Sequence, residues 1–154
     1  MNAAAKTYED ALERVCTTTI AENAAAVDRD GSFPAKSIEA LRSAGLLGAL
    51  SSKESGGLGL GLPGAARIIR RVAEECGSTA MVLTMHYCGT AVLEAYGTSA
   101  LRHEAASGQH LSTLAFSEAG SRSHFWVPVS TAEARNGKAL LIHHAALTRV
   151  HQDE

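Results

Sequence analysis

The sequence has no run of five or more basic residues, and its charges nearly balance. Fourteen lysines and arginines stand against sixteen acidic residues, which gives a formal net charge of −2. Proteins that bind nucleic acid by charge usually carry a basic patch or a strongly basic balance. The sequence therefore gives no indication of a nucleic-acid partner.

Cysteine is scarce, and its three positions form no recognisable pair. Cys16, Cys76 and Cys88 are scattered without a Cys-x-x-Cys spacing. An odd, scattered set is typical of reduced, mostly buried thiols and not of a disulfide framework. Residues 1–30 lack a continuous apolar core and carry acids such as Glu9, Asp10 and Glu13, unlike a secretory signal or a mitochondrial presequence. We therefore expect a cytoplasmic protein.

Long apolar runs are also missing. The longest uncharged stretch, residues 76–93, contains serine, threonine, histidine, tyrosine and glycine, too many polar groups for a membrane span. A helix buried on most sides of a helical bundle fits it better. With 45% apolar and 19% charged residues, the chain has the composition of a folded domain.

Helical periodicity predicts about five helices before residue 109. They are expected at about 7–26, 32–45, 63–76, 78–96 and in a short segment that ends near Gly108. Ser32 and Ser78 are the expected N-caps. The expected inner face of the third helix comprises Ile69, Val72, Ala73 and Cys76. The expected centre of the bundle comprises Met81, Val82, Met85 and Val92.

After residue 109 the pattern changes to short strands, expected at 111–116, 126–130 and 139–142. Asn136-Gly137 is a hairpin-turn signal. The predicted fold class is therefore mainly α, a helical bundle followed by a few strands. The predicted division is a helical domain at 1–109, a β region at 110–142 and an atypical tail at 143–154.

One glycine motif matches the dinucleotide-binding fingerprint letter for letter. Residues 59–64 read Gly-Leu-Gly-Leu-Pro-Gly, but that fingerprint must follow a strand and open a helix. Here it follows a helix and a polar loop, and Pro63 removes one N–H at the helix start. A flexible loop is the better interpretation.

Other chemistry-bearing residues have ordinary explanations. His86 and Cys88, two apart on a helix, point in different directions, and His143 and His144 face opposite sides of a strand. No metal site is predicted. The helical carboxylates are expected on solvated faces, at Glu74, Glu75, Glu94 and Glu104. No Gly-x-Ser-x-Gly elbow is present for a hydrolase triad, so no catalytic residue is assigned.

Several motifs, in order, resemble the acyl-CoA dehydrogenase family across roughly residues 7–137. The first runs from Phe33-Pro34 through Ile38-Glu-Ala-Leu-Arg-Ser-Ala-Gly-Leu-Leu-Gly48 to Glu54-Ser-Gly-Gly-Leu-Gly59. The second comprises Cys76-Gly-Ser-Thr-Ala-Met81 and Met85-His-Tyr-Cys88. The third, Leu111-Ser-Thr-Leu-Ala-Phe-Ser-Glu-Ala-Gly-Ser-Arg-Ser123, resembles the family's flavin-binding strand and loop.

This resemblance implies a fold and an activity. The family has an α-helical N-terminal domain, a middle β-barrel and a C-terminal four-helix bundle, so the few strands here would belong to an incomplete barrel. Its members use FAD to remove hydrogens from Cα and Cβ of an acyl-CoA thioester in fatty acid metabolism. A glutamate base takes the α-proton while the flavin accepts a hydride. The implied partners are an electron acceptor such as an electron-transfer flavoprotein and, in a complete protein, further copies of the chain.

The resemblance also assigns site residues one by one. The flavin would contact Leu114, Ala115, Phe116, Ser117, Gly120 and Ser123. Ser123 would also lie beside the acyl-CoA, and Arg122 could pair with one of its phosphates.

Departures from the family pattern are concentrated in and after that loop. Ala119, Arg122 and His124 replace the usual Pro, Gly and Asp, and Ala146 stands where a flavin-covering Trp is expected. No glutamate matches the catalytic base. These departures predict a truncation or a reading-frame change after about Leu141. They leave two hypotheses, a dehydrogenase with parts missing here and a non-catalytic helical domain that serves as a binding or interaction module.

Overall fold

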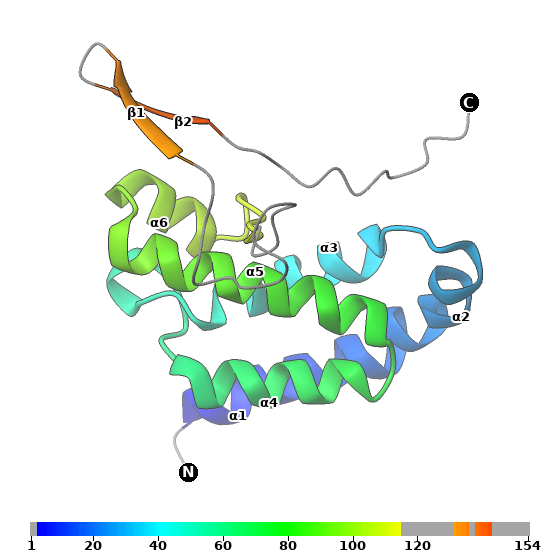
Figure 1. Ribbon diagram of the computed structural model, residues 1–154. Helices are drawn as coiled ribbons and strands as arrows, with labels where there is room; N and C mark the ends of the chain where they lie inside the picture. Colours follow the sequence, from blue (N-terminus) through cyan, green and yellow to red (C-terminus); the bar gives the residue numbers. More distant parts are fainter. Residues whose placement is uncertain (1–2, 115–130, 136–137, 143–154) are drawn as a thin grey trace. The chain divides into compact units, whose positions relative to one another are not determined.

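The computed structural model describes the backbone of residues 3–114, 131–135 and 138–142, and side-chain surroundings from Tyr8 to Leu114. The chain divides into two units, Met1–Leu114 and Ala115–Glu154, which are described separately. The first unit is helical (Figure 1). Within the described residues, no helix is long and apolar enough to cross a membrane.

The first predicted helix is longer than expected and contains an irregular turn. α1 (Ala3–Val15) continues through a π-helical turn, η1 (Cys16–Ile20), into α2 (Ala21–Asp30). In and around this turn the Thr17 and Thr18 hydroxyls donate to the carbonyls of Glu13 and Arg14, at 2.9 and 2.7 Å. Such back-bonding competes with the helix ladder and loosens it locally.

The second predicted helix starts later than its expected cap. α3 (Ala35–Ser43) follows Pro34, and no side chain caps its first turn, so the prediction of Ser32 as N-cap was wrong. Two short 3₁₀ turns follow, η2 (Leu46–Ala49) and η3 (Lys53–Ser55). Gly31, with φ of +58°, ends α2 in the left-handed region that glycine adopts without strain.

The glycine-rich loop is held in place by its backbone. Leu58 and Leu60 donate N–H groups to carbonyls of η2, at 2.9 and 3.0 Å, and Gly59 donates to the Ser51 carbonyl at 2.9 Å. The residues that match the fingerprint follow the 3₁₀ turn η3, whereas a dinucleotide-binding fold requires a strand at that place. The loop that was predicted to be flexible is therefore held by backbone hydrogen bonds to the segment before it.

α4 (Gly61–Ala73) packs along α5 (Gly77–Tyr96), and the two lie side by side in Figure 1. The buried face of α4 is formed by Ala65, Ile68 and Val72, whereas Ala73 is exposed and Ile69 half-buried. The predicted inner face is thus confirmed at Val72 and Cys76 and wrong at Ala73, while Ile69 packs half-buried against the core. The α5 N-cap is Cys76, whose Sγ accepts the Thr79 N–H at 3.4 Å, in place of the predicted Ser78.

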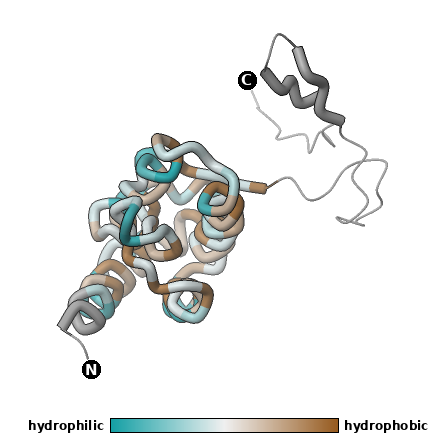
Figure 2. Tube along the Cα trace, turned by 90° about the vertical axis from the view of Figure 1, so that its left-hand side faces the viewer, coloured by the Kyte–Doolittle hydropathy of each residue, from teal (hydrophilic) through white to brown (hydrophobic). Residues whose placement is uncertain are grey.

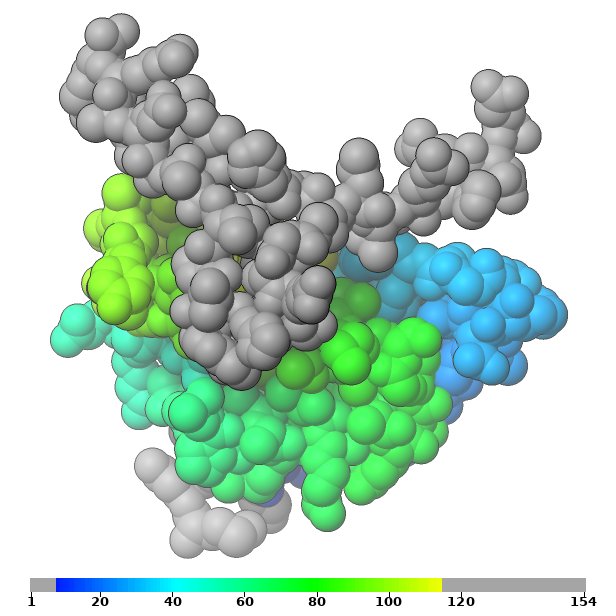
Figure 3. Space-filling model, viewed as in Figure 1, coloured from blue at the N-terminus to red at the C-terminus, as the bar shows by residue number. Residues whose placement is uncertain are grey.

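The inner face of α5 differs most from expectation. Met81 and Val92, predicted at the bundle centre, are 62% and 42% exposed, and Val82 and Met85 are half-buried. The buried residues of α5 are Thr79, Ala80, Leu83, His86, Tyr87, Gly89 and Thr90. α5 is therefore exposed along one apolar side, and α4 and α5 form much of the face seen in Figure 3.

The core draws on every long element of the unit. Figure 2 shows apolar and polar stretches alternating along its helices, as expected for helices that each bury one face. The fully buried large side chains include Ile20, Leu41, Leu46, Leu47, Ile68, Val72 and Leu83. α6 (Ser99–Ala106) begins at Thr98, whose hydroxyl accepts the Leu101 N–H at 3.3 Å.

The described part of the second unit is one antiparallel pair of strands. β1 (Thr131–Arg135) pairs antiparallel with β2 (Lys138–Ile142), in a register running from Thr131 opposite Ile142 to Arg135 opposite Lys138. β2 contains the strand predicted at 139–142. Residues 111–114 are in no strand within the described structure. The strand predicted at 126–130, the Asn136-Gly137 turn and the tail from 143 lie outside it, and the incomplete barrel stays a prediction.

Candidate functional site

An apolar hollow lies on the exposed side of α5. It has a volume of about 330 Å³ and is lined by Phe33, Met81, Val82, Met85, Leu111, Ser112 and Thr113. No lining residue is charged, and its two most exposed apolar side chains are Met81 at 62% and Phe33 at 57%. An accessible hollow of this composition suits an apolar ligand.

Helical spacing places the methionines of this hollow. Met81 and Met85 are four residues apart, so both lie on one side of α5, with Val82 beside them. Methionine is flexible and polarizable, and methionine-lined surfaces adapt to apolar ligands of different shapes. The opposite wall is the segment from Leu111 to Thr113, which leaves the bundle after α6.

Gly89 lets that segment lie close to α5. A Cβ at Gly89 would meet the Ser112 Cβ at 2.5 Å and the Thr113 nitrogen at 3.2 Å. A second hollow of about 250 Å³ adjoins this crossing and shares Leu111, Ser112 and Thr113 with the first. The exposed apolar side of α5 therefore continues past Gly89 to Val92.

His86 fixes the same segment from beneath. Its Nδ1 accepts the backbone N–H of Ser112 at 3.2 Å, so Nε2 carries the proton and donates to the Leu47 carbonyl at 3.1 Å. Burial is the main cause that lowers the pKa of His86, the Leu47 bond opposes it, and nearby His110 adds to the lowering. The ring is therefore a neutral connector between α5, η2 and Ser112.

The neighbouring tyrosine anchors η2 as well. Tyr87 is buried, and its hydroxyl donates to the Leu46 carbonyl at 2.6 Å. Burial raises the pKa of the Tyr87 hydroxyl well above its usual range. Consecutive residues of α5 thus satisfy the carbonyls of consecutive residues in η2, which ties η2 to the buried side of α5.

One predicted surface carboxylate is not on the surface. The Glu94 side chain is 18% exposed and pairs with Arg102 of α6 at 3.4 Å, which corrects its assignment to a solvated face. Arg102 also lies 3.4 Å from the Ser52 hydroxyl. Glu74 and Glu104 are exposed as predicted, whereas Glu75 is half-buried against Arg71 at 2.9 Å. The Glu94–Arg102 pair joins α5 to α6, and the Glu75–Arg71 pair is local to the end of α4.

Only one of the residues assigned by resemblance to the flavin has described surroundings. Leu114 is half-buried and lines the second hollow. Ala115, Phe116, Ser117, Gly120, Arg122 and Ser123 lie outside the described residues. In the part that is described, no group of three or more histidine, cysteine or acidic side chains could hold a metal ion, and Cys88 is half-buried.

The family profile described as "Acyl-CoA dehydrogenase, N-terminal domain" matches residues 2–108. The chain belongs to the acyl-CoA dehydrogenase family. Searches of curated proteins and of solved structures give no match. The matched range covers the helical unit up to Gly108 and includes the methionine side of the hollow.

Sequence reasoning did not find the hollow of this family member. Met81, Val82 and Met85 carried the right chemistry but were expected inside the bundle. No sequence signal separates the two sides, because one neighbour of His86, Tyr87, is buried while the other, Met85, is only half-buried. Helix geometry could have separated the two sides only after His86 was known to be buried.

Proposed function

We propose that this protein takes part in flavin-dependent α,β-dehydrogenation of an acyl-CoA thioester, and that the α5 hollow receives the acyl chain. The observation that carries the proposal is the uncharged hollow along Met81 and Met85, bounded by Leu111–Thr113, in the segment that leads to the predicted flavin strand. An aliphatic chain gains about 0.8 kcal/mol for each buried CH₂ group, so an apolar wall is what it needs.

The described hollow does not fit the charged part of FAD. Its lining has no cation, whereas a pyrophosphate is usually held by charged side chains. FAD is therefore proposed to contact the segment that follows, through Ala115, Phe116, Ser117, Gly120 and Ser123, with Arg122 toward the phosphates of CoA. When bound, the flavin supplies the hydride acceptor. No residue of this chain is assigned as the base.

The methionines provide a direct test of acyl-chain binding. The chain has only three, Met1, Met81 and Met85, so selective ¹³C-methyl labelling gives a spectrum that can be assigned completely. On titration with octanoyl-CoA, we expect saturable shifts of the Met81 and Met85 signals. Met1 serves as an internal reference that should not move.

Matched variants distinguish specific binding in the hollow from non-specific binding to apolar surface. Met85→Asp should abolish the shift of the remaining Met81 signal, because burying the chain against a carboxylate leaves that charge unpaired. Leu62→Asp, at a side chain 72% exposed on α4 and outside the hollow, should leave the shifts unchanged. Equal shifts at all three methionines, or an unaltered titration of the Met81 signal in Met85→Asp, would contradict acyl-chain binding in this hollow.

The flavin assignment needs a separate measurement. We expect FAD, followed by its fluorescence during titration with the full 154-residue chain, to bind weakly and reversibly. Ser123→Leu should weaken that binding about five-fold, since a lost hydrogen bond and a steric clash act together. Ser130→Leu is the control. Identical titrations for the wild type and Ser123→Leu would contradict the contact.

A second candidate function is a binding module without catalysis. The helical unit has a continuous hydrophobic core of its own, running from Tyr8 in α1 to Tyr87 in α5. Such a unit can present the α5 hollow to an acyl chain without a flavin. Octanoyl-CoA shifts at Met81 and Met85 with no FAD binding at any concentration would favour this function over dehydrogenation.

A further inference from the structure

The α5 hollow contains two side-chain hydroxyls, and both belong to the same wall. Ser112 and Thr113 supply them from the segment that follows α6, whereas the α5 wall of Met81, Val82 and Met85 offers only hydrocarbon and sulfur. The adjoining hollow of about 250 Å³ is lined by the same two residues of the segment. An acyl chain that extends from one hollow into the other would therefore pass these hydroxyls.

The Ser112 hydroxyl is not used by the fold. Its oxygen is buried, and it has no hydrogen-bond partner among the described residues. By contrast, the buried Thr90 hydroxyl of α5 donates to the His86 carbonyl at 2.9 Å. An unpaired buried polar group costs free energy, which a ligand that supplies a partner would recover.

The backbone of Ser112 is fixed on two sides. Its N–H donates to His86 Nδ1 at 3.2 Å, so this donor is already used. Its Cβ lies against α5 at a position without a side chain, since a Cβ added to Gly89 would be 2.5 Å away from it. Rotation between staggered positions about the Cα–Cβ bond is the freedom that is left to the hydroxyl. The hydroxyl can therefore turn toward a ligand, but the residue cannot withdraw from it.

The charge around the two hollows limits the kind of group that can bind Ser112. No lysine, arginine, aspartate or glutamate lines either hollow. A carboxylate or an ammonium group carried there would be buried without an ion of opposite charge. A serine hydroxyl both donates and accepts, so it can pair with a hydroxyl or a keto oxygen. An uncharged oxygen substituent is the group that fits.

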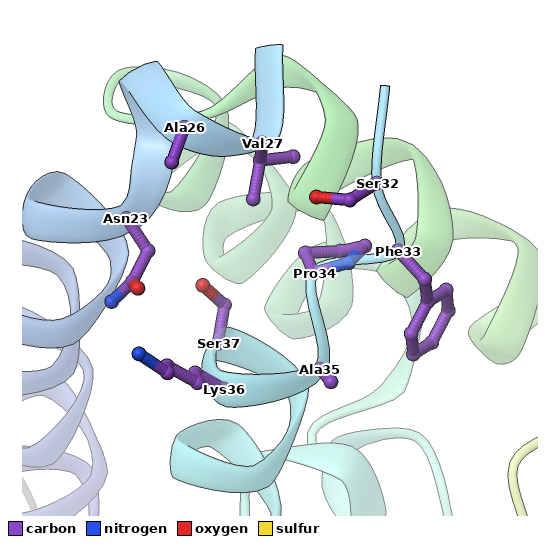
Figure 4. A pocket seen from close by; sticks show the side chains of 9 residues that line it. All are labelled: Asn23, Ala26, Val27, Ser32, Phe33, Pro34, Ala35, Lys36 and Ser37. Atoms are coloured by element: carbon purple, nitrogen blue, oxygen red, sulfur yellow. The ribbon is translucent and has the colours of Figure 1, made fainter. Parts of the chain in front are cut away.

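The opposite end of the α5 hollow offers no comparable group. It is formed by Phe33, which also lines a separate cavity of about 220 Å³ between α2 and α3 (Figure 4). Figure 4 shows the Phe33 ring turned away from Asn23 and Ser37 of that cavity, and neither of these side chains lines the α5 hollow. A polar substituent on the acyl chain therefore finds its partner at the Ser112 wall and not at this end.

We infer that the acyl group taken by this site carries an uncharged hydroxyl or keto substituent, which the Ser112 hydroxyl binds and which distinguishes it from a plain fatty acyl group. The inference rests on the proposed function, because it takes the α5 hollow as the acyl-chain site. In a purely apolar hollow, an added hydroxyl would weaken binding, since the loss of its hydration would not be compensated. Ser112 is thus a specificity-determining residue.

The probes are octanoyl-CoA and three analogues that carry a hydroxyl on the sixth, seventh or eighth carbon of the chain. Each is titrated into the full chain, and binding is followed by the methyl signals of Met81 and Met85. We expect at least one hydroxylated probe to bind about three- to ten-fold more tightly than octanoyl-CoA, the gain of one hydrogen bond to a group that is otherwise unpaired.

Ser112→Ala removes the hydroxyl and leaves the rest of the wall. It should abolish the preference for the hydroxylated probe, while the affinity for octanoyl-CoA stays within about two-fold, because no hydrogen bond to that probe is lost. The retained octanoyl-CoA titration also shows that the variant folds with an intact hollow. Ser99→Ala, at an exposed serine of α6 outside both hollows, is the matched control and should keep the preference.

Two results would overturn the inference and leave the proposed function intact. One is octanoyl-CoA binding at least as tightly as every hydroxylated probe, which would mean that an internal water or no group at all pairs with Ser112. The other is a preference for a hydroxylated probe that survives in Ser112→Ala. If Met81 and Met85 respond to none of the four probes, the proposed function and this inference are both wrong.

Discussion

The Nδ1 atom of His86 accepts the backbone N–H of Ser112 at 3.2 Å, although the two residues are 26 positions apart. The same ring donates to the Leu47 carbonyl, so one imidazole joins α5 to η2 and to the segment that leaves the bundle. Protonation of Nδ1 would replace an acceptor by a donor and break the bond to Ser112. The geometry of the α5 hollow therefore depends on a neutral His86.

This bond predicts a loss of stability in mild acid. Above about pH 6.5 the imidazole is neutral in the folded and the unfolded chain. Below it, the unfolded chain binds a proton that the folded protein resists, because burial lowers the pKa of His86. The free energy of unfolding should then fall with a slope of up to about 1.4 kcal/mol per pH unit, until the folded-state pKa is passed.

Urea unfolding between pH 7.5 and pH 5 measures this slope. His86→Gln keeps a donor for the Leu47 carbonyl and cannot titrate, so its stability should be lower at pH 7.5 and depend less on pH. His103→Gln, at an exposed histidine of α6, is the control and should keep the wild-type slope. An identical slope in His86→Gln would mean that other groups cause the acid sensitivity.

Gly89 and Gly77 predict opposite effects of the same substitution within α5. Gly89→Ala adds a methyl 2.5 Å from the Ser112 Cβ and should destabilise the protein by about 1–3 kcal/mol through overpacking. Gly77→Ala meets nothing within 4 Å and should stabilise by up to about 1 kcal/mol through helix propensity. Thermal unfolding of both variants checks the pair. If Gly89→Ala is also stabilising, the segment at Ser112 does not lie against α5.

The sequence predicted the ends of some helices but not which side of α5 is buried. The end of α5 at Gly97 was predictable, because glycine interrupts a periodic pattern, whereas α2 continues to Asp30, past the end predicted near residue 26. The inner face of α5 was not predictable, since the helix has no charged residue from Gly77 to Leu93 to mark a solvent side. Burial there follows hydrogen-bond satisfaction, as Thr90 donates to the His86 carbonyl at 2.9 Å while the more apolar Met81 is exposed.

The candidate site was predictable only in part, for the same reason. The resemblance pointed to the family through short motifs, and the family profile confirms it over residues 2–108. The hollow, however, is built by Phe33 from before α3 and by Leu111 from after α6, which meet only in the folded unit. No local pattern connects residues so far apart in the chain.

Removing the hydroxyl of Tyr87 should lower the free energy of unfolding, whereas removing that of Tyr96 should not. Tyr87→Phe removes a buried hydroxyl that donates to the Leu46 carbonyl at 2.6 Å and leaves that carbonyl without its partner. The expected loss is about 1–2 kcal/mol. Tyr96→Phe, at a side chain 88% exposed, should leave stability unchanged. Urea unfolding of both variants measures the difference, and equal stabilities would show that η2 does not depend on this bond.

The three cysteines are expected to react in a fixed order. Cys16 is fully buried, and burial raises the pKa of its thiol to about 11, so very little thiolate is present at pH 8. Cys76 is buried, and its Sγ accepts from Thr79. Cys88 is half-buried and should react first with a disulfide reagent such as DTNB.

The time course of the reaction of the native chain with DTNB at pH 8 should therefore show one thiol that reacts fast and two that react only as the protein unfolds. Cys88→Ser should remove the fast phase. Cys76→Ser, which keeps an oxygen able to cap α5, should retain it. A fast phase that survives in Cys88→Ser would place the reactive thiol on Cys16 or Cys76 and would mean that the helical unit opens readily around η1 or the start of α5.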